Sequence, residues 1–446
     1  MMDSTTSAGR LYKMLSHKKD GIVAVGPHGT TTAEQFQREA TALAALLPDA
    51  GFLVNLCTNR YRFMVGFAAA LLRGQVSLMP AAATPAVLRD LATEYPGLYA
   101  LTDGPAPDLP HLRFPELLPE AGEAQLDIPG AQPAVVLFTS GSTGKPKPVT
   151  KSWSVLVHSA RSAGERLGVA AMCGGCITGT VPHQHSYGLE SVITLAWQHG
   201  LAVFTDTPLF PADVRAALQA TPTPRLLVTT PIHLRALTAD PGGMPAVAML
   251  LCATAPLPAS LAKAAEAVFS APLMEIYGCT EAGQIASRRS AQDTDWHCFD
   301  AVTLHCSEAR WWASGAAVEG IAPVQDELEP TGERHFRLGS RVADLVNIAG
   351  KRSSISYLNH QLLAVPGVRD GSFLMEDDEI LAVPRLKAVA VAPGLTVMTI
   401  MQALREQLDP AFLPRPLILV EALPRNNLGK LLWADLLMLA SRQEAE

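Results

Sequence analysis

The chain has 446 residues, of which 48% are hydrophobic and 17% are charged, and its formal net charge is −7 at pH 7. A single core stops growing at about 250 to 300 residues, so we expect two or more domains. The acidic balance and the lack of a basic stripe argue against nucleic acid as a partner.

The first residues carry no apolar segment like that of a secretory signal. No run of about 18 apolar residues occurs, so the sequence predicts no membrane span. Seven cysteines, an odd number, fit a reducing cytoplasm better than a disulfide framework. Cys173 and Cys176 form a C-x-x-C pair, but no second pair stands at ligand spacing, which favours buried structural thiols over a metal or redox site. We therefore expect a cytoplasmic protein.

Helical and strand patterns alternate from the start of the chain. Apolar residues recur at helical spacing over 32–48 and 60–73, while 52–57 and 76–79 are short apolar strands. The alternation resumes at the strand 134–138. It continues with helices over 153–167 and 189–199 and strands at 177–181, 202–204, 226–229 and 248–252. This order predicts a large α/β domain with mostly parallel sheets.

The pattern changes near residue 295, where short strands and acidic turns replace the long helices. A small α+β module follows, with a strand at 388–391, a helix at 397–407 and a last helix after Gly429. We predict an N-terminal domain over 1–340 and a small, mobile C-terminal domain over 341–446.

A loop rich in Gly, Ser and Thr lies at 139–147, directly after a predicted strand. Its glycines allow close approach to an anion, its N–H and hydroxyl groups can donate to phosphate oxygens, and its lysines add charge. It is not a Walker A loop, because Gly144 and Lys145 are followed by Pro146. The candidate ligands are Thr139, Ser140, Gly141, Ser142, Thr143, Gly144 and Lys147.

A second motif, Tyr277-Gly278-Cys279-Thr280-Glu281, follows the apolar strand 273–276. It combines an aromatic face, a glycine, a hydroxyl and a carboxylate. A carboxylate beside a phosphate site is best explained by Mg²⁺, which takes one or two carboxylates together with phosphate oxygens. A capped turn at a strand end is the structural alternative.

The loop 139–147 and the motif at 277–281 resemble those of the adenylate-forming superfamily, which includes acyl- and aryl-CoA synthetases, luciferases and adenylation domains. The resemblance implies that Tyr277 packs on adenine beside Gly278, that Thr280 contacts phosphate and that Glu281 holds Mg²⁺. Ala253-Thr254-Ala255-Pro256-Leu257 is similar to the family segment lining the adenine and acyl site, which assigns Ala255 to the nucleotide.

Three further elements occur in the family's order. Pro182-His183-Gln184-His185-Ser186-Tyr187-Gly188-Leu189 resembles the family's Pro-x-x-His-x-x-Gly-Leu, which places His185 against the substrate carboxylate. Arg341 follows Asp326 at the family's spacing for two residues that bind ribose and open the hinge. A solvated acidic loop around Asp326 is the alternative. Lys430 stands where the family has its catalytic lysine, which stabilises charge built up in the transition state.

The resemblance implies that a carboxylate attacks the α-phosphate of MgATP to give an acyl-adenylate. A thiol of coenzyme A or of a carrier protein's phosphopantetheine, supplied in trans, then accepts the acyl group. His185 and Tyr187 favour an aryl or arylacryl acid, with a medium or long fatty acid as the alternative. Pro148 and Ala343 depart from the family pattern and leave a non-catalytic nucleotide-binding relative open. A luciferase-like oxygenase is a remote alternative.

Overall fold

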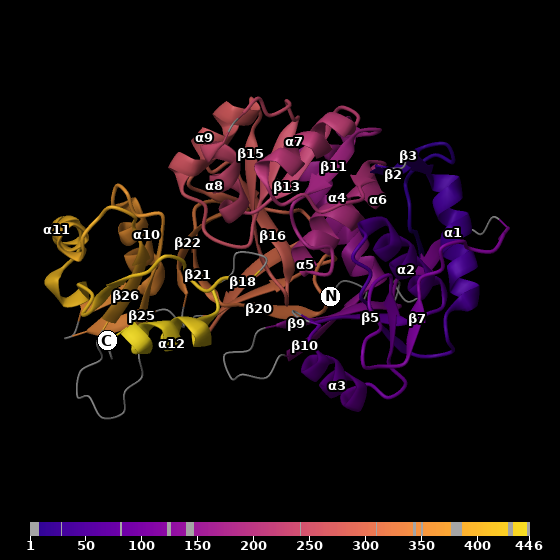
Figure 1. Cartoon of the computed structure of the whole chain (residues 1–446), viewed down its shortest axis with the longest axis horizontal. Coiled ribbons are helices and arrows are strands. Elements are labelled where there is room, and N and C mark those ends of the chain that lie inside the picture. The colour runs from indigo at the N-terminus through magenta and orange to yellow at the C-terminus, as the bar shows by residue number, and fades with distance from the viewer. Residues whose placement is uncertain are drawn as a thin grey trace. The chain divides into compact units, whose positions relative to one another are not determined.

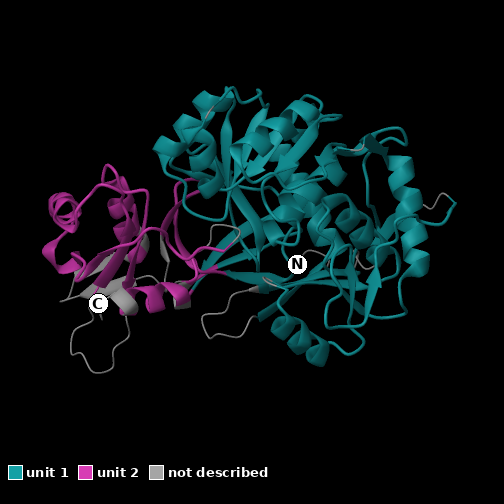
Figure 2. Cartoon of the chain, in the orientation of Figure 1, with its two compact units in different colours: residues 1–307, 312–323, 333–335 teal, residues 308–311, 324–332, 336–446 magenta. Residues whose placement is uncertain are grey.

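The computed structural model describes residues 9–27, 29–80, 83–122, 126–139, 147–240, 242–308, 310–341, 345–348, 351–375, 386–426 and 431–443. Figure 2 shows two compact units. Unit 1 contains residues 1–307, 312–323 and 333–335, and unit 2 contains 308–311, 324–332 and 336–446. The division into domains over 1–340 and 341–446 stays a prediction.

The first sheet of unit 1 has six strands in the order β10-β9-β5-β4-β6-β7. Figure 1 labels β5, β7, β9 and β10 of this sheet. All neighbours in it are parallel except the pair β9–β10. The strands are β4 (Phe52–Asn55), β5 (Val76–Met79), β6 (Tyr99–Thr102), β7 (His111–Arg113), β9 (Pro133–Thr139) and β10 (Lys147–Ser152).

The second sheet of unit 1 contains strands in the order β17-β16-β15-β14-β13-β11-β12-β2-β3. From β15 to β2 every neighbouring pair is parallel, so the expectation of mostly parallel sheets is confirmed. The strands are β2 (Ile22–Gly26), β3 (Gly29–Thr32), β11 (Cys176–Gly179), β12 (Ala202–Phe204), β13 (Arg225–Thr229), β14 (Met249–Cys252), β15 (Leu273–Cys279), β16 (Gly283–Arg288) and β17 (Trp296–Cys298).

Helices connect these strands, and those over 33–46, 60–72 and 153–167 lie where apolar periodicity predicts them. Thr32 and Gln35 form a capping box at the start of α1, and Asn59 caps α2. The helices are α1 (Ala33–Leu46), α2 (Arg60–Leu72), α3 (Pro85–Glu94), α4 (Trp153–Leu167), α7 (Pro211–Ala220), α8 (Pro231–Ala239) and α9 (Ala259–Phe269). The expected helix 189–199 is divided into a π-helix η2 (Leu189–Thr194) and α6 (Leu195–His199), preceded by the short α5 (Ser186–Gly188).

Four helices meet in an aromatic core. The ring of Trp197 on α6 lies 5.6 Å from Phe36 on α1, 6.0 Å from Phe67 on α2 and 6.4 Å from Trp153 on α4. A separate apolar cluster joins α7, α8 and α9 to β13, β14 and β15. Another joins α3 to β5 and β9. These clusters fix the sheet edges from which the candidate site is built.

The rest of unit 1 is made of short strands. The pair β1 (Leu11–Lys13) and β8 (Asp127–Pro129) is antiparallel. Strands β18 (Thr303–Ser307), β19 (Arg310–Ser314) and β20 (Ile321–Val324) follow β17 and include residues of both units.

Unit 2 has its own core. The sheet β25-β26-β27 carries α10 and α11 on one apolar cluster and α12 on another. Its elements are β21 (Asp326–Pro330), most of β22 (His335–Arg341), β23 (Leu345–Ile348), β24 (Lys351–Ser354), α10 (Ile355–Ala364), β25 (Asp370–Met375), β26 (Leu386–Val391), α11 (Val397–Gln407), η4 (Pro410–Phe412), β27 (Leu417–Leu419) and α12 (Trp433–Gln443).

Candidate active site

The predicted phosphate loop joins two paired strands. Thr139 at the end of β9 lies opposite Lys147 at the start of β10 in an antiparallel register. Both ends of the loop are therefore held by the sheet, as a loop that binds an anion through its backbone requires. The predicted ligands Ser140, Gly141, Ser142, Thr143 and Gly144 lie outside the described residues.

The Tyr277–Glu281 motif lies on a tight hairpin. The sequence predicts that the motif follows a strand that ends at residue 276. Strand β15 instead extends to Cys279, so the motif forms the last part of this strand and the turn into β16. A Cβ at Gly278 would lie 2.2 Å from the carbonyl oxygen of Gly283 on the facing strand. Only glycine permits this approach. The turn places Thr280 and Glu281 between two paired strands.

Tyr277 is part of an aromatic wall. Its ring lies 5.5 Å from that of Trp296 on β17, and the guanidinium of Arg288 lies 4.4 Å from the Trp296 ring centroid. The two rings are tilted by 53° to each other, and such an aromatic surface is a suitable flank for an adenine ring. Sequence reasoning did not single out Trp296, because it lies in a segment without a recognised motif.

The His185 segment closes tightly on itself. A Cβ at Gly188 would lie 2.0 Å from the carbonyl oxygen of Pro182, which explains the glycine of the motif. The Nδ1 atom of His185 accepts the backbone N–H of Tyr187 at 3.2 Å. A neutral His185 therefore carries its proton on Nε2, where it can donate to a carboxylate. Tyr187 is buried, and its hydroxyl donates to the carbonyl of Thr229 at the end of β13.

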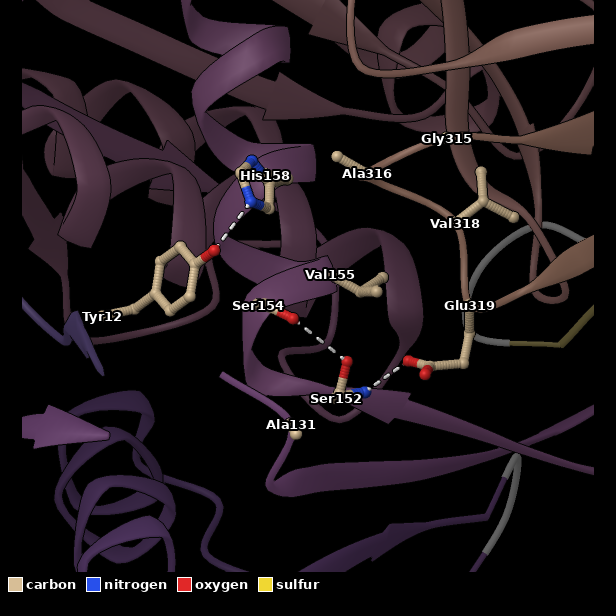
Figure 3. Close-up of a pocket in the computed structure, with 10 residues that line it drawn as sticks. All are labelled: Tyr12, Ala131, Ser152, Ser154, Val155, His158, Gly315, Ala316, Val318 and Glu319. Atoms are coloured by element: carbon tan, nitrogen blue, oxygen red, sulfur yellow. Dashed lines mark hydrogen bonds between the residues drawn. The ribbon is translucent and has the colours of Figure 1, made fainter. Parts of the chain in front are cut away.

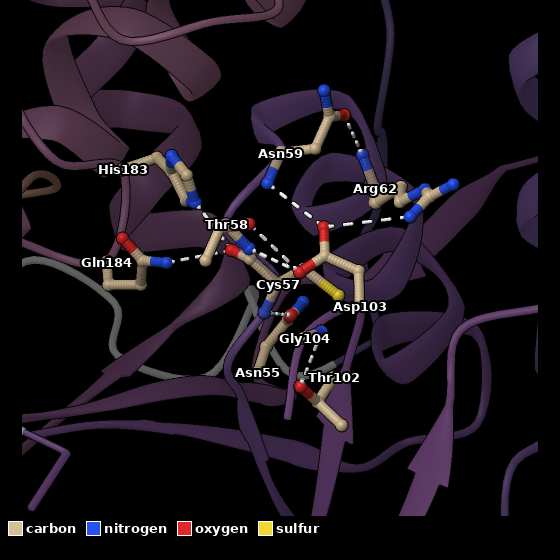
Figure 4. Close-up of polar contacts among 10 residues, drawn as sticks. All are labelled: Asn55, Cys57, Thr58, Asn59, Arg62, Thr102, Asp103, Gly104, His183 and Gln184. Atoms are coloured by element: carbon tan, nitrogen blue, oxygen red, sulfur yellow. Dashed lines mark hydrogen bonds and ion pairs between the residues drawn. The ribbon is translucent and has the colours of Figure 1, made fainter. Parts of the chain in front are cut away.

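The two residues before His185 are anchored to the first sheet (Figure 4). The ring of His183 and the side-chain amide of Gln184 each lie 2.9 Å from the carbonyl oxygen of Cys57. Burial, together with the nearby charge of Arg60, lowers the pKa of His183 to about 3, so the ring is neutral at pH 7. A neutral ring can donate this bond from Nε2, which fixes the segment leading into His185.

Thr254 lies after β14 in the left-handed region, with φ of 85°. A β-branched residue pays about 1–3 kcal/mol for this conformation, and such strain gathers at ligand sites. The neighbouring Ala255 is half-buried, and Leu257 is buried. Because β11, β13, β14 and β15 are parallel neighbours, their carboxyl ends bring these segments to one edge of the second sheet.

Sequence reasoning missed a buried ion pair at this edge. Lys151 on β10 and Glu190 on η2 are 1% and 2% exposed, and their charged groups lie 3.9 Å apart. Glu190 is the one acidic residue in the predicted helix 189–199, and this is the signal in the sequence that could have found the pair.

A cavity lies beside Ser152, the last residue of β10 (Figure 3). It measures about 320 Å³ and is lined by Tyr12, Ser152, His158 and Glu319, among others. The Glu319 carboxylate accepts the backbone N–H of Ser152 at 2.8 Å, and His158 lies 3.1 Å from the Tyr12 hydroxyl. These groups are paired within the wall of the cavity.

Two predicted ribose residues are brought together in unit 2. Asp326 on β21 lies directly opposite Arg341 on β22 in the antiparallel register, so the spacing that suggested a pair reflects a hairpin. The alternative of an acidic loop is wrong in its structure, because Asp326 starts a strand and is half-buried.

Lys430 and the hinge residue Ala343 lie outside the described residues. The segment before Lys430 is fixed, because the Arg425 guanidinium makes two bonds of 2.7 Å to Asp370. Arg425 also forms an isolated antiparallel bridge with Leu431. The loop that contains Lys430 therefore starts and ends on paired backbone.

Within the described ranges, His, Cys, Asp and Glu do not gather in groups of three or more that could hold a metal ion. In the same part of the chain no helix is long and apolar enough to cross a membrane. All seven cysteines are free; Cys176 is buried as expected, but Cys173 is exposed.

Comparisons with known proteins agree with this geometry. The family model "AMP-binding enzyme" matches residues 81–310. A 4-coumarate–CoA ligase of Rhodobacter capsulatus is 30% identical over 308 residues, covering 66% of this chain and 74% of the relative. A 4-coumarate–CoA ligase of Halorhodospira halophila is 29% identical over 317 residues, covering 66% and 73%.

A solved structure shares the fold. It is the o-succinylbenzoate CoA synthetase of Bacillus subtilis in complex with its acyl-adenylate intermediate. It has a TM-score of 0.79 and 19% identity and covers 94% of this chain and 95% of that chain.

The chain belongs to the AMP-binding enzyme family. The expected resemblance to adenylate-forming enzymes is confirmed, and with it the class of AMP-forming acid–thiol ligases. The roles of the individual site residues stay predictions.

Proposed function

We propose that this chain uses ATP to activate an aryl or arylacryl acid and transfers the acyl group to a thiol. The observation that carries the proposal is the convergence of three segments on one buried ion pair: the strand β10 after the phosphate loop, the His185 segment and the Thr280–Glu281 turn. Contacts through Lys151 and Glu190 join all three.

In the first half-reaction a carboxylate oxygen of the acid attacks the α-phosphorus of ATP. The bond from that phosphorus to the bridging oxygen breaks, pyrophosphate leaves with its electron pair, and an acyl-adenylate forms. Catalysis here consists of positioning and charge stabilisation. Thr139, Lys147 and Thr280 bind phosphate oxygens, Tyr277 packs on adenine and Lys430 stabilises the charge that develops between the reacting groups.

Glu281 would hold Mg²⁺ in this proposal. Mg²⁺ bound to a nucleotide needs only one or two protein carboxylates, since phosphate oxygens and water complete its octahedron. Glu281 is half-buried at the hairpin turn beside the Thr280 hydroxyl, so the donors present fit this ion. When bound, Mg²⁺ supplies neutralisation of phosphate charge.

In the second half-reaction a thiol attacks the carbonyl carbon of the adenylate. The carbon–oxygen bond to AMP breaks, a thioester forms, and the thiol proton is released to solvent. Coenzyme A is the first acceptor to test, and a phosphopantetheine on a carrier protein in trans is the alternative. In this proposal the domain over 341–446 is mobile and delivers Lys430 for the first step only. The free cysteines support a reducing compartment such as the cytoplasm.

The acid is assigned from two observations. The backbone N–H of Tyr187, a residue with a buried aromatic ring, bonds to Nδ1 of His185 and leaves the Nε2–H to hold the acid's carboxylate. The relatives from Rhodobacter capsulatus and Halorhodospira halophila are 4-coumarate–CoA ligases, and coumarate is an arylacryl acid.

The test is ATP–pyrophosphate exchange against a panel of hydroxybenzoates, hydroxycinnamates and saturated fatty acids. Wild-type protein and Lys430→Ala are compared with and without EDTA. We expect exchange with an aromatic acid that is lost in Lys430→Ala and on removal of Mg²⁺. Exchange with fatty acids alone would replace the assigned substrate class. ATP binding without exchange for any acid would refute catalysis.

A further inference from the structure

The pair formed by Lys151 and Glu190 is unusual in being enclosed from all sides. Lys147 and Lys151 both lie on β10, and Glu190 is the second residue of the π-helix η2. Their side chains are 1% and 2% exposed. Placing two charges in such an interior costs several kcal/mol per ion before their attraction is counted. A gain in folding stability alone therefore does not explain the buried ion pair, and its neighbours indicate another role.

The carboxylate of Glu190 is held from two helices. Ser159 on α4 donates to Oε2 at 3.1 Å, and Ser186 on α5 donates to Oε1 at 2.8 Å. Ser186 directly follows His185. The orientation of Glu190 is thereby coupled to the start of α5, whose N-cap is His185.

The pair also abuts the Thr280–Glu281 hairpin. A Cβ on Gly283 would lie 2.9 Å from Nζ of Lys151 and 3.2 Å from Oε2 of Glu190, so the hairpin backbone rests on the pair. Next along β16, the Gln284 amide donates to Ser191 beside Glu190, at 3.0 Å. The turn can shift toward the pair only if the two charged groups move.

We propose that Lys151 and Glu190 are positioning residues that set the spacing of the phosphate-loop strand, the His185 segment and the Thr280–Glu281 turn. The inference rests on the proposed function, since those three segments are its adenylation machinery. The pair touches no reacting atom. It acts by holding β10, the His185 segment and the Thr280–Glu281 turn at fixed distances. Turns of π-helix such as η2 are frequent at functional sites.

The experiment compares the double variant Lys151→Met/Glu190→Gln with wild type. Methionine and glutamine keep the approximate volumes. The glutamine oxygen still accepts from one of the two serines, and its NH2 group can donate to the hydroxyl of the other, so the fold is retained. Because a small misplacement of reacting groups is costly, kcat for exchange should fall about tenfold or more while KM for the acid stays within about twofold. The Kd of ATP, measured by calorimetry without any acid, should rise about fivefold or more.

A milder variant avoids removing the charges. Ser159→Ala deletes one hydrogen bond to Glu190 and leaves the ion pair in place. Its matched control is Ser162→Ala on the same helix, because Ser162 is equally enclosed but accepts from the backbone of Ala301. We expect kcat to fall severalfold in Ser159→Ala alone, with both variants melting within a few degrees of each other.

The outcomes separate the two proposals. Unchanged kcat and unchanged ATP affinity in a folded double variant would overturn the positioning role. Equal losses in Ser159→Ala and Ser162→Ala would overturn it as well. If wild type binds ATP but exchanges with no acid, the proposed function fails, and the ATP affinities of the variants still decide the role of the pair.

Discussion

The two sheets of unit 1 have similar parallel cores but very different carboxyl edges. At the edge of the first sheet, Asp103 follows β6 and accepts the backbone N–H groups of Thr58 and Asn59 at 2.8 and 3.1 Å (Figure 4). At the edge of the second sheet stand the His185 segment, Thr254 and the Thr280–Glu281 turn. The first edge uses its polar groups to begin α2. The second carries the His185 and Tyr277–Glu281 motifs, while the predicted phosphate loop follows β9 of the first sheet.

The difference shows that topology alone does not make a site. Both edges satisfy the rule that ligands bind beyond the carboxyl ends of parallel strands. At the first edge, the carboxylate of Asp103 accepts N–H groups just before α2, and the carbonyl of Cys57 binds the segment that leads into His185. We infer that the first edge holds the His185 segment of the second edge in place. Variants at either edge test this inference.

The largest expected effect is on the residue that joins the edges. Arg60 at the start of α2 is fully buried and donates to the carbonyl oxygens of Gly179 and Val181 at 3.0 and 3.1 Å. It also donates to Phe204 and Asp206. Arg60→Met leaves these acceptors unpaired and should lower the free energy of unfolding by about 3–5 kcal/mol.

Urea denaturation would measure the loss in Arg60→Met. Arg38→Met is the control, since Arg38 makes only an exposed pair with Glu34. A loss below about 1 kcal/mol would mean that the two edges are held together by apolar packing alone.

The next effect is on activity at the second edge. Gly278→Ala puts a methyl group 2.2 Å from the Gly283 carbonyl and must open the hairpin that bears Glu281. ATP–pyrophosphate exchange should fall about a hundredfold, because reacting groups displaced by about 1 Å lose that much. Gly51→Ala is the control, since a Cβ there meets nothing within 4 Å. Full activity in Gly278→Ala would remove this turn from the proposed machinery.

The opposite result is expected at the first edge. Asp103→Ala removes the acceptor of the first N–H groups near α2 and should cost about 1–2 kcal/mol of stability. The kcat for exchange should stay within about twofold, because Asp103 contacts Thr58, Asn59 and Arg62 and, among the described residues, none of the predicted ligands. Thermal melting and exchange kinetics on one sample test both statements. A large loss of kcat without a loss of stability would make the first edge part of the site.

Much of this arrangement could be predicted from the sequence, because local signals and the fold agree. The strands over 52–57 and 226–229 and the helix over 153–167 follow from apolar periodicity alone. The site motifs carry their glycines at points of close backbone approach, as Gly188 and Gly278 show. The Lys151–Glu190 pair could not be predicted, since its partners come from separate segments that only the tertiary fold brings together. The π-helix was missed for the same reason.

The smallest expected effect comes from relieving the backbone strain at Thr254, which lies at the carboxyl edge of the second sheet. The described non-glycine residues with positive φ are Thr254, Ser270 and Glu308, and only Thr254 follows a strand at either carboxyl edge. Thr254→Gly relieves that strain but adds freedom to the unfolded chain, so stability should rise by about 1 kcal/mol or less. If the left-handed backbone at Thr254 fixes the shape of the nucleotide site, the more flexible glycine should slow ATP–pyrophosphate exchange while the melting temperature rises. Ser270→Gly, in the same backbone region but at the end of α9, should gain stability with unchanged exchange. If both variants are equally active, the strain at Thr254 has no role in the second edge.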